Sequence, residues 1–270
     1  MRCIFCAVTS DDSQGQEHII PEALGNEEHV LPRGVVCDSC NNYFGVKIEG
    51  PLLDTLHFAN LRARQEVPNK RRRLPIMRGI YPAARMPIGL QRTEKGLSIS
   101  PLHEADSDKF ISTVLTRKSG SVWMPLQGHV DERLLSRFLA KVAVEMFADR
   151  YLKAGEPWSL LIDMPMLEAV RRFTRYGDRP LAWPIHRRRI YDEEAVFGPG
   201  GHQVMHEFDF LHTAGEELFA VICIFGEEFA INLGGPSIDG YVDFLAKQGG
   251  RSPLYAPGEL ESALRPVTER

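Results

Sequence analysis

The sequence predicts an α+β protein in which a small N-terminal module, held by a metal ion, precedes a larger α+β domain with an antiparallel sheet. Two Cys-x-x-Cys pairs within the first 40 residues predict the module. An apolar pattern of helical period over 131–153 and four strand-like apolar segments between 182 and 233 predict the domain. The composition, 43% hydrophobic and 25% charged, is that of a globular protein and excludes fibrous or disordered chains.

The two cysteine pairs share the same spacing and predict a structural zinc site. Each Cys-x-x-Cys offers two thiolates, and four thiolates complete the tetrahedral coordination of Zn²⁺, leaving no open position for chemistry. No apolar leader precedes the first cysteine, so we expect a cytoplasmic protein, in which paired cysteines are metal ligands rather than disulfides. A redox pair would need a βαβ context, which is missing here. The expected zinc ligands are Cys3, Cys6, Cys37 and Cys40.

Between and after these pairs lie two motifs, Gln16-Glu17-His18-Ile19-Ile20-Pro21-Glu22-Ala23-Leu24-Gly25 and Cys37-Asp38-Ser39-Cys40-Asn41-Asn42. Together with the cysteines they resemble the HNH endonucleases, also called ββα-metal or His-Me finger nucleases, in the subgroup with four zinc-binding cysteines. The resemblance covers about residues 3–45. It implies a zinc-stapled ββα-metal module, in which a helix starting near Asn41 lies against the hairpin that carries Glu17 and His18.

The resemblance also implies roles for three side chains. His18 matches the general base, Glu17 the acidic metal ligand before it, and Asn41 the closing ligand, for which Asn42 is the competing choice. The ion would be Mg²⁺, Mn²⁺ or a similar divalent cation. Adjacent side chains of a regular strand point to opposite faces, so either the chain bends at Glu17 and His18 or one of the two is structural.

Phosphodiester hydrolysis explains these residue types. A neutral imidazole, with an unperturbed pKa of about 6.5, accepts a proton from water near neutral pH, and a hard cation needs only one or two protein oxygens beside water and phosphate. The middle asparagine that normally orients the histidine is not evident, and Pro32 lies near its place. Asn26, which follows Gly25, could supply the orienting amide. The alternative is that His18 is a turn histidine in a non-catalytic zinc module.

The segment after the module is strongly basic and carries prolines at 68, 75, 82 and 87. Residues 60–95 hold 10 basic and 2 acidic side chains, and we interpret them as an extended connection with short strands. Basic side chains here could contact DNA phosphates, although a solvated loop is an equal alternative. The candidates are Arg62, Arg64, Lys70, Arg71, Arg72 and Arg73. A second set, open to the same two interpretations, comprises Arg171, Arg172, Arg187, Arg188 and Arg189.

Two helices follow. The first covers 131–153, with Asp131 in its first turn, and the second covers 164–176 and ends at Gly177, a typical C-cap. Within the first helix, three charged residues recur at four-residue steps, and we interpret them as a solvated row of ion pairs. They are Arg137, Lys141 and Glu145.

The last third of the chain predicts strands. They cover 182–191, 204–211, 218–225 and 229–233, with a tight turn at Gly226-Glu227-Glu228 and a short helix over 238–246. Cys223 lies in the third strand, where we expect a buried, inert thiol.

We therefore expect four regions: a nuclease module at 1–58, a basic linker with short strands at 59–100, an α+β domain of unknown role at 101–250 and a loose tail at 251–270. The predicted function is that of a metal-dependent HNH endonuclease hydrolysing DNA, with RNA not excluded, in restriction or phage defence. The alternative is a non-catalytic zinc module that binds nucleic acid or protein. Residues 190–270 hold 4 basic and 14 acidic side chains, which suits a protein partner or self-association, and no segment predicts a membrane span.

Overall fold

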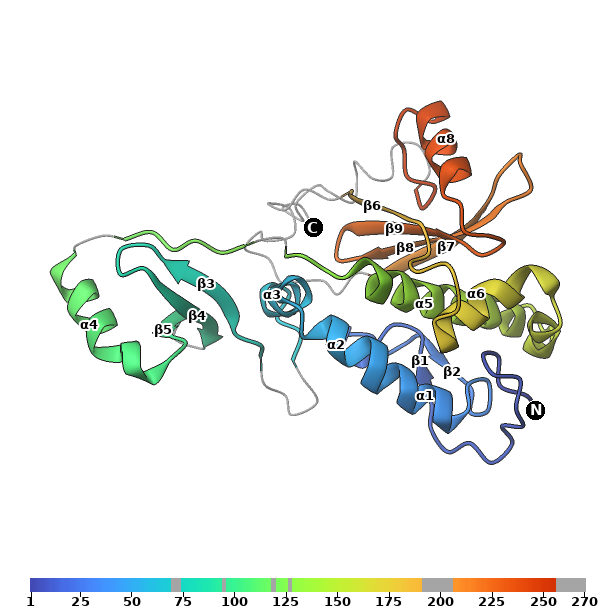
Figure 1. Cartoon of the computed structure of the whole chain (residues 1–270), viewed down its shortest axis with the longest axis horizontal. Coiled ribbons are helices and arrows are strands. Elements are labelled where there is room, and N and C mark those ends of the chain that lie inside the picture. The colour runs from blue at the N-terminus through green and yellow to red at the C-terminus, as the bar shows by residue number, and fades with distance from the viewer. Residues whose placement is uncertain (69–73, 94–95, 118–119, 126–127, 191–205, 256–270) are drawn as a thin grey trace, which may run out of the picture. The chain divides into compact units, whose positions relative to one another are not determined.

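The computed structural model describes residues 1–68, 74–93, 96–117, 120–125, 128–190 and 206–255 (Figure 1). It confirms the α+β class: helices accompany sheets whose strands are all antiparallel. In the described part of the chain, every helix is too short or too polar to cross a membrane. The chain forms two compact units. The first comprises Met1–Glu22, Asn26–Pro51 and the chain from Asp131 onward, and the second comprises Ala23–Gly25 and Leu52–Val130.

The first unit begins with a short hairpin and a helix. Strand β1 (Glu17–His18) pairs antiparallel with β2 (Val30–Leu31), and a 3-10 turn, η1 (Glu22–Leu24), lies between them. Helix α1 (Asp38–Phe44) begins three residues before the predicted start at Asn41 and follows Cys37 directly. The hairpin and helix that the motifs imply are therefore both present.

The helix continues beyond α1 with a change of hydrogen-bond pattern. A π-helical turn, η2 (Gly45–Glu49), leads into α2 (Gly50–Leu53), which contains Pro51. Proline has no N–H to donate, and its ring crowds the carbonyl four residues earlier, so a wider turn before it relieves that contact.

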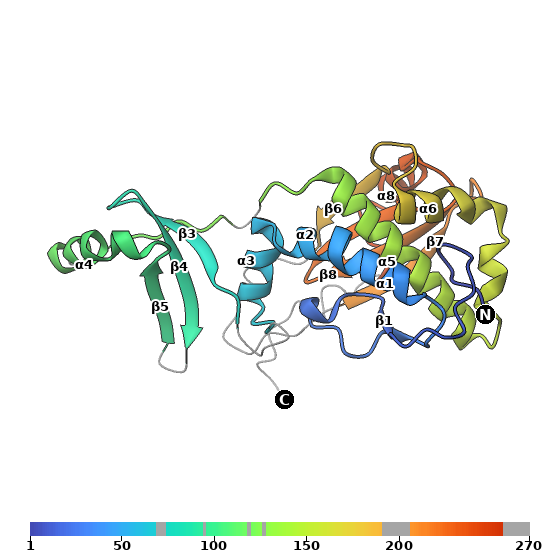
Figure 2. The same ribbon diagram turned by 60° about the horizontal axis from the view of Figure 1, so that its bottom comes forward.

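Two long helices pack together in the same unit. Helix α5 (Glu132–Lys153) is capped by Asp131, whose carboxylate accepts a hydrogen bond of 2.7 Å from the N–H of Leu134. After a 3-10 segment, η4 (Trp158–Ile162), helix α6 (Pro165–Tyr176) ends at Gly177, whose φ of 72° is the left-handed conformation expected of a C-cap. Both predicted helices are confirmed. Helix α5 contacts η2 on one side and the strands of the C-terminal sheet on the other (Figures 1 and 2).

The C-terminal sheet has the order β6-β9-β8-β7, all antiparallel. Its strands confirm the four predicted segments, and helix α8 (Asp239–Lys247) covers the sheet with Tyr241 packed against Phe219. The strands are β6 (Ile185–Arg189), β7 (His206–His212), β8 (Leu218–Ile224) and β9 (Glu227–Asn232).

The predicted turn at Gly226-Glu227-Glu228 is wrong at both glutamates, and only Gly226 belongs to the loop. The loop consists of Phe225 and Gly226, with φ values of 50° and 79°, and both glutamates belong to β9. A two-residue hairpin of this kind requires positive φ at both positions, and a phenylalanine seldom adopts it. Within the strand, the glutamates pair with Arg187 and Arg188 of β6, so part of the acidic surplus in the C-terminal third is neutralised internally.

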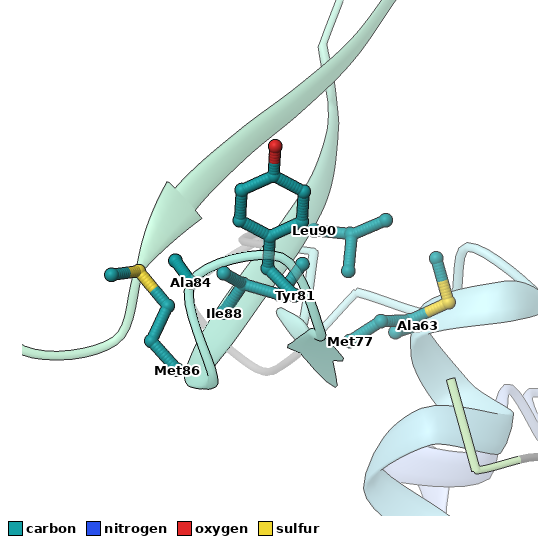
Figure 3. Close-up of a cluster of buried hydrophobic side chains, with 7 residues drawn as sticks. All are labelled: Ala63, Met77, Tyr81, Ala84, Met86, Ile88 and Leu90. Atoms are coloured by element: carbon teal, nitrogen blue, oxygen red, sulfur yellow. The ribbon is translucent and has the colours of Figure 1, made fainter. Parts of the chain in front are cut away.

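The second unit is built on helix α3 (Leu56–Arg64) and the three-stranded sheet β3-β4-β5. The strands are β3 (Met77–Tyr81), β4 (Met86–Thr93) and β5 (Gly96–Pro101), followed by η3 (Glu104–Asp106) and helix α4 (Ser107–Thr116). The short strands predicted here are confirmed, but they form a sheet with its own apolar core rather than an extended connection. Figure 3 shows that core: Ala63, Met77, Tyr81, Ala84, Met86, Ile88 and Leu90.

Candidate active site and metal centre

The four cysteines come together as the sequence predicts. Their sulfur atoms all lie within 4.8 Å of one another, and within the described residues this is the one group of histidine, cysteine and acidic side chains that could hold a metal ion. Cys3 begins a tight turn in which its N–H bonds to the carbonyl of Val8, while Cys37 and Cys40 stand at the start of α1. All four are free of disulfides, and four clustered sulfur ligands suit an ion such as Zn²⁺.

Backbone and side-chain N–H groups donate to the sulfur atoms of this cluster. The backbone N–H of Cys37 lies 3.4 Å from Sγ of Cys3, and Nε of Arg175, on α6, lies 3.2 Å from Sγ of Cys40. A hydrogen bond from Cys40 lowers the pKa of the Cys3 thiol to about 5, which favours a thiolate at neutral pH. The Arg175 guanidinium also lies over the ring of Tyr43, at 4.1 Å from its centroid. Arg175 was not identified from the sequence.

Glu17 and His18 make up strand β1 at the centre of the candidate site. Glu17 is only 5% exposed, whereas His18 is partly exposed. Each has one buried acceptor atom for which the described residues supply no hydrogen-bond partner, Oε2 of Glu17 and Nδ1 of His18. Since buried polar atoms are nearly always paired, each of these two atoms can accept a partner such as a cation or a water.

The other oxygen of Glu17 contacts a lysine on α5. Nζ of Lys141 lies 2.6 Å from Oε1 of Glu17, 2.7 Å from Oε1 of Glu49 and 3.1 Å from Oε2 of Glu145. It also donates to two successive backbone carbonyls, those of His18 at 2.9 Å and Ile19 at 3.4 Å. Successive carbonyls of a regular strand point in opposite directions, so the chain bends directly after His18. This bend lies after His18 and not between Glu17 and His18, which pair with Leu31 and Val30 as consecutive strand residues.

The interpretation of Arg137, Lys141 and Glu145 as a solvated row is wrong. Lys141 and Glu145 have no exposed side-chain surface, and Arg137 donates to the hydroxyl of Tyr43 and the carbonyl of Thr174. The apolar composition of the helix around these residues already favours a buried position over a solvated one. From Phe138 to Ala148, Lys141 and Glu145 are the only polar residues, and a helix that is apolar on all sides is a buried helix.

The buried charges shift one another's pKa values. Burial disfavours the charge on Lys141, but the three carboxylates outweigh that effect and raise its pKa well above the ordinary value. Burial also raises the pKa of Glu145 well above its ordinary value and raises the pKa of Glu17, with Lys141 opposing both shifts. Lys141 therefore stays an ammonium, and any extra proton in this cluster is favoured on a carboxylate.

Asn41 links the helix to the hairpin. Its Nδ2 donates to the carbonyl of Gln16 at 3.1 Å, which brings its amide to the residue before Glu17. The loop before β1 is fixed to the same helix, because the carboxylate of Asp38 accepts from the N–H of Gly15 at 2.8 Å. A Cβ at Gly15 would lie 3.2 Å from Nδ2 of Asn41, so glycine permits this close approach. The neighbouring Asn42 is exposed.

The hypothesis that Asn26 orients His18 is wrong. Asn26 is 2% exposed, and its Nδ2 donates to the carbonyls of Ile20 and His29, at 2.6 Å and 3.0 Å. Its Oδ1 accepts from the N–H groups of Glu28 and His29. The amide is thus fully used in closing the hairpin loop on its own backbone, and Pro32, directly after β2, offers no amide in its place.

The basic candidates have different environments. Arg64 is 6% exposed, which removes it from the side chains able to reach a phosphate in this conformation, and burial lowers the pKa of the half-buried Arg62. Lys70, Arg71, Arg72 and Arg73 lie outside the described residues.

Most of the second basic set has partners within the protein. Arg171 donates to the carbonyls of Leu161 and Ile162. Three others form ion pairs: Arg172 with Asp178, Arg187 with Glu227 and Arg188 with Glu228. These four arginines are therefore engaged within the protein, on α6 and β6, and do not form a solvated loop.

Comparison with known proteins agrees with the motifs. Residues 3–57 match a protein-family model described as HNH endonuclease, which supports a nuclease-type function and nucleic-acid binding in general. No curated protein and no solved structure gave a significant match. The matched residues include the four clustered cysteines together with Glu17, His18 and Asn41. The resemblance seen in the sequence is thereby confirmed: over residues 3–57 this chain is similar to the HNH endonucleases.

Proposed function

We propose that the protein is a metal-dependent endonuclease that hydrolyses phosphodiester bonds of DNA, with His18 as the general base. One observation carries the proposal: Glu17 and His18, adjacent on β1, each keep a buried side-chain atom without a hydrogen-bond partner in the described chain, and the amide of Asn41 bonds to the carbonyl of the residue before them. A role in restriction or phage defence is the biological setting that the resemblance suggests.

The donor set at β1 fits a divalent cation such as Mg²⁺ or Mn²⁺. Oε2 of Glu17 is unpaired in the described residues, and Asn41 uses Nδ2 for its bond to Gln16, which leaves Oδ1 for a ligand. Carboxylate and amide oxygens are the hard donors that these ions prefer, and one or two protein oxygens suffice beside phosphate and water. When bound, such an ion supplies charge stabilisation for the scissile phosphate and the leaving oxygen.

His18 has the properties of a base for this reaction. Its side chain is partly exposed, so water and a nucleic acid can reach the ring. A neutral imidazole can take the proton from the attacking water and then release it to solvent. Its backbone carbonyl is fixed by the bond from Lys141, which limits where the ring can lie.

The cysteine cluster would hold Zn²⁺ in a structural role. Four thiolates leave no open coordination position, so this ion would not activate water. Its effect is to fix the first turn of α1, which carries Cys40 and Asn41, against the N-terminal turn that carries Cys3.

A second candidate function is that of a non-catalytic zinc module that binds nucleic acid or protein. The observation that favours it is the environment of Glu17, which is 5% exposed and already bonded to Lys141. In that case the Glu-His pair would serve only to attach the hairpin to α5.

Cleavage assays separate the two functions. Purified protein is incubated with supercoiled plasmid, and separately with RNA, in Mg²⁺ or Mn²⁺ and in chelator. His18→Ala is the test variant, and His212→Ala, at an exposed histidine of β7, is the matched control. The nuclease predicts ion-dependent cleavage of DNA by wild type and His212→Ala and none by His18→Ala. Equal cleavage by all three, or no cleavage with any ion, would refute it.

A further inference from the structure

Lys141 joins the two halves of the candidate nuclease site from outside the segment that matches the family. Its ammonium contacts Glu17 and the carbonyl of His18 on the hairpin, and Glu49 in η2, the continuation of the helix that carries Asn41. Lys141 itself lies on α5, far beyond residue 57 in the sequence. The side chain is completely buried, so it cannot touch a nucleic acid.

Lys141 makes more contacts than a buried ion pair with Glu17, Glu49 and Glu145 requires. Besides three carboxylates, Nζ reaches the carbonyls of both His18 and Ile19, at the point where the chain bends. The imidazole of His18 has no such support in the described part of the chain, because its Nδ1 is unpaired and the amide of Asn26 is used elsewhere. The position of His18 is therefore fixed through its backbone, by the pairing of β1 with β2 and by the bond from Lys141.

We propose that Lys141 is the positioning residue of this active site. It holds the Glu17 carboxylate by Oε1, leaving Oε2 for a cation, and it holds the peptide that carries the His18 ring. Through Glu49 it also sets the helix of Asn41 against that hairpin. This inference rests on the proposed function, and it makes α5 part of the catalytic apparatus although α5 supplies no group to the reaction.

The first test separates turnover from DNA binding in the full-length protein. Lys141→Met removes the ammonium but keeps an unbranched side chain, and Lys141→Arg keeps a cationic donor. Lys153→Met is the matched control, because it removes from the same helix a lysine that is 65% exposed and paired with Asp149. Each protein is assayed for zinc content, for DNA affinity by fluorescence anisotropy without divalent ion, and for turnover at saturating Mn²⁺ and DNA.

A positioning role predicts a split between these measurements. Lys141→Met keeps its zinc and its DNA affinity, while its turnover falls about 100-fold, since small misplacements of reacting groups have effects of this size. Lys141→Arg recovers part of the turnover, and Lys153→Met matches the wild type. Unchanged turnover in Lys141→Met would overturn the proposal. A parallel loss of DNA affinity and turnover would also overturn it, because that is the result of a merely structural role.

Glu49→Gln keeps the proposal testable if Lys141→Met fails to fold. This variant retains Lys141 and weakens only its contact with the helix, from a side chain that is 17% exposed. Turnover about 10-fold lower with unchanged DNA affinity is the expected result. Turnover equal to that of the wild type would contradict the positioning role.

A second readout needs no cleavage. In protein labelled with ¹³C-histidine, the ring signal of His18, assigned with His18→Gln, should broaden when a small amount of Mn²⁺ is added. In Lys141→Met the same broadening should need about 10 times more Mn²⁺, the usual scale for the loss of a group that supports a metal ligand. Removing the positive charge of Lys141 should by itself strengthen the binding of Mn²⁺. A weaker broadening of the His18 signal in Lys141→Met therefore shows that Glu17 and His18 are no longer held in place. Broadening at equal or lower Mn²⁺ would overturn the proposal.

The two readouts also separate this inference from the proposed function. A wild-type protein that cleaves neither DNA nor RNA refutes the nuclease, yet the Mn²⁺ response of His18 still tests the role of Lys141. A wild type that cleaves, beside a Lys141→Met protein that cleaves equally well, refutes the positioning role and leaves the nuclease intact.

Discussion

Nε of Arg175 lies 3.2 Å from Sγ of Cys40, so α6 donates a hydrogen bond directly to the cysteine cluster. The two residues are 135 positions apart in the chain. A guanidinium beside a thiolate offsets part of the negative charge that four cysteines place around a divalent ion, and it orients the sulfur. The cysteine cluster is therefore supported from outside the matched segment, as the hairpin is by Lys141.

Arg175→Met should release zinc faster. Removing the N–H donor leaves Sγ of Cys40 more open to protons and to competing ligands, and the loss of a group that supports a metal ligand typically weakens metal binding about 10- to 100-fold. The measurement is the rate of zinc transfer to a coloured chelator. Arg172→Met is the control, because Arg172 lies on the same helix and pairs with Asp178. Equal release rates for the two variants would show that the Arg175 contact does not stabilise the centre.

Cys37→Ser should lose the ion and unfold the N-terminal module. Three remaining thiolates bind zinc weakly, and in small metal-held modules the free energy of binding is also free energy of folding. Elemental analysis should find about one zinc per chain in the wild type and less in the variant. Cys223→Ser, which changes a buried cysteine of β8 outside the cluster, should keep its zinc. A wild type without zinc would remove the assignment.

Glu145 makes stability depend on pH. Burial raises its pKa in the folded state well above the unfolded value, so the folded protein binds more protons at this site. This contribution is fully present below the unfolded pKa of about 4.3 and is lost as pH rises from there through the folded pKa. Glu145→Gln, which resembles the protonated acid, should remove that loss. The denaturant midpoint of Glu145→Gln minus that of the wild type should therefore grow as the pH rises from 4 to 8. A difference that stays constant over this range would contradict the account.

The basic run at 70–73 is expected to contact DNA phosphates. Replacing Arg71, Arg72 and Arg73 by glutamine should make DNA affinity depend less on salt. The slope of the logarithm of the binding constant against the logarithm of salt concentration should become shallower by up to about 0.9 for each phosphate that is no longer neutralised. Arg172→Gln serves as the control, because its charge is already paired with Asp178. An unchanged slope in the triple variant would place the run away from the DNA.

Features determined by neighbouring residues could be predicted from the sequence. The cysteine cluster, the hairpin at Glu17 and the helix at Asn41 follow from local motifs, and Asp131 and Gly177 mark the ends of long helices through their caps. Each cap lies at the helix end that it marks, and each cysteine pair is recognised from its own two-residue spacing.

Features that depend on distant residues could not be predicted. Lys141 contacts His18 and Arg175 contacts Cys40 across more than a hundred positions of the chain. The four-residue spacing of Lys141 and Glu145 is also what an exposed ion-pair row would show. The turn at Phe225 was displaced because positive φ at a phenylalanine has no signature in sequence. The second unit was underestimated because its apolar residues are spread over short strands that acquire a common core only when paired.

Chemical rescue of His18→Gly by imidazole tests the central claim most directly. The variant, checked for full zinc content, is assayed on plasmid DNA with Mn²⁺ over a range of pH and imidazole concentration. If His18 is the general base, the variant is inactive alone, and added imidazole restores cleavage in proportion to its neutral form. Cleavage by His18→Gly at the wild-type rate without imidazole would contradict the account.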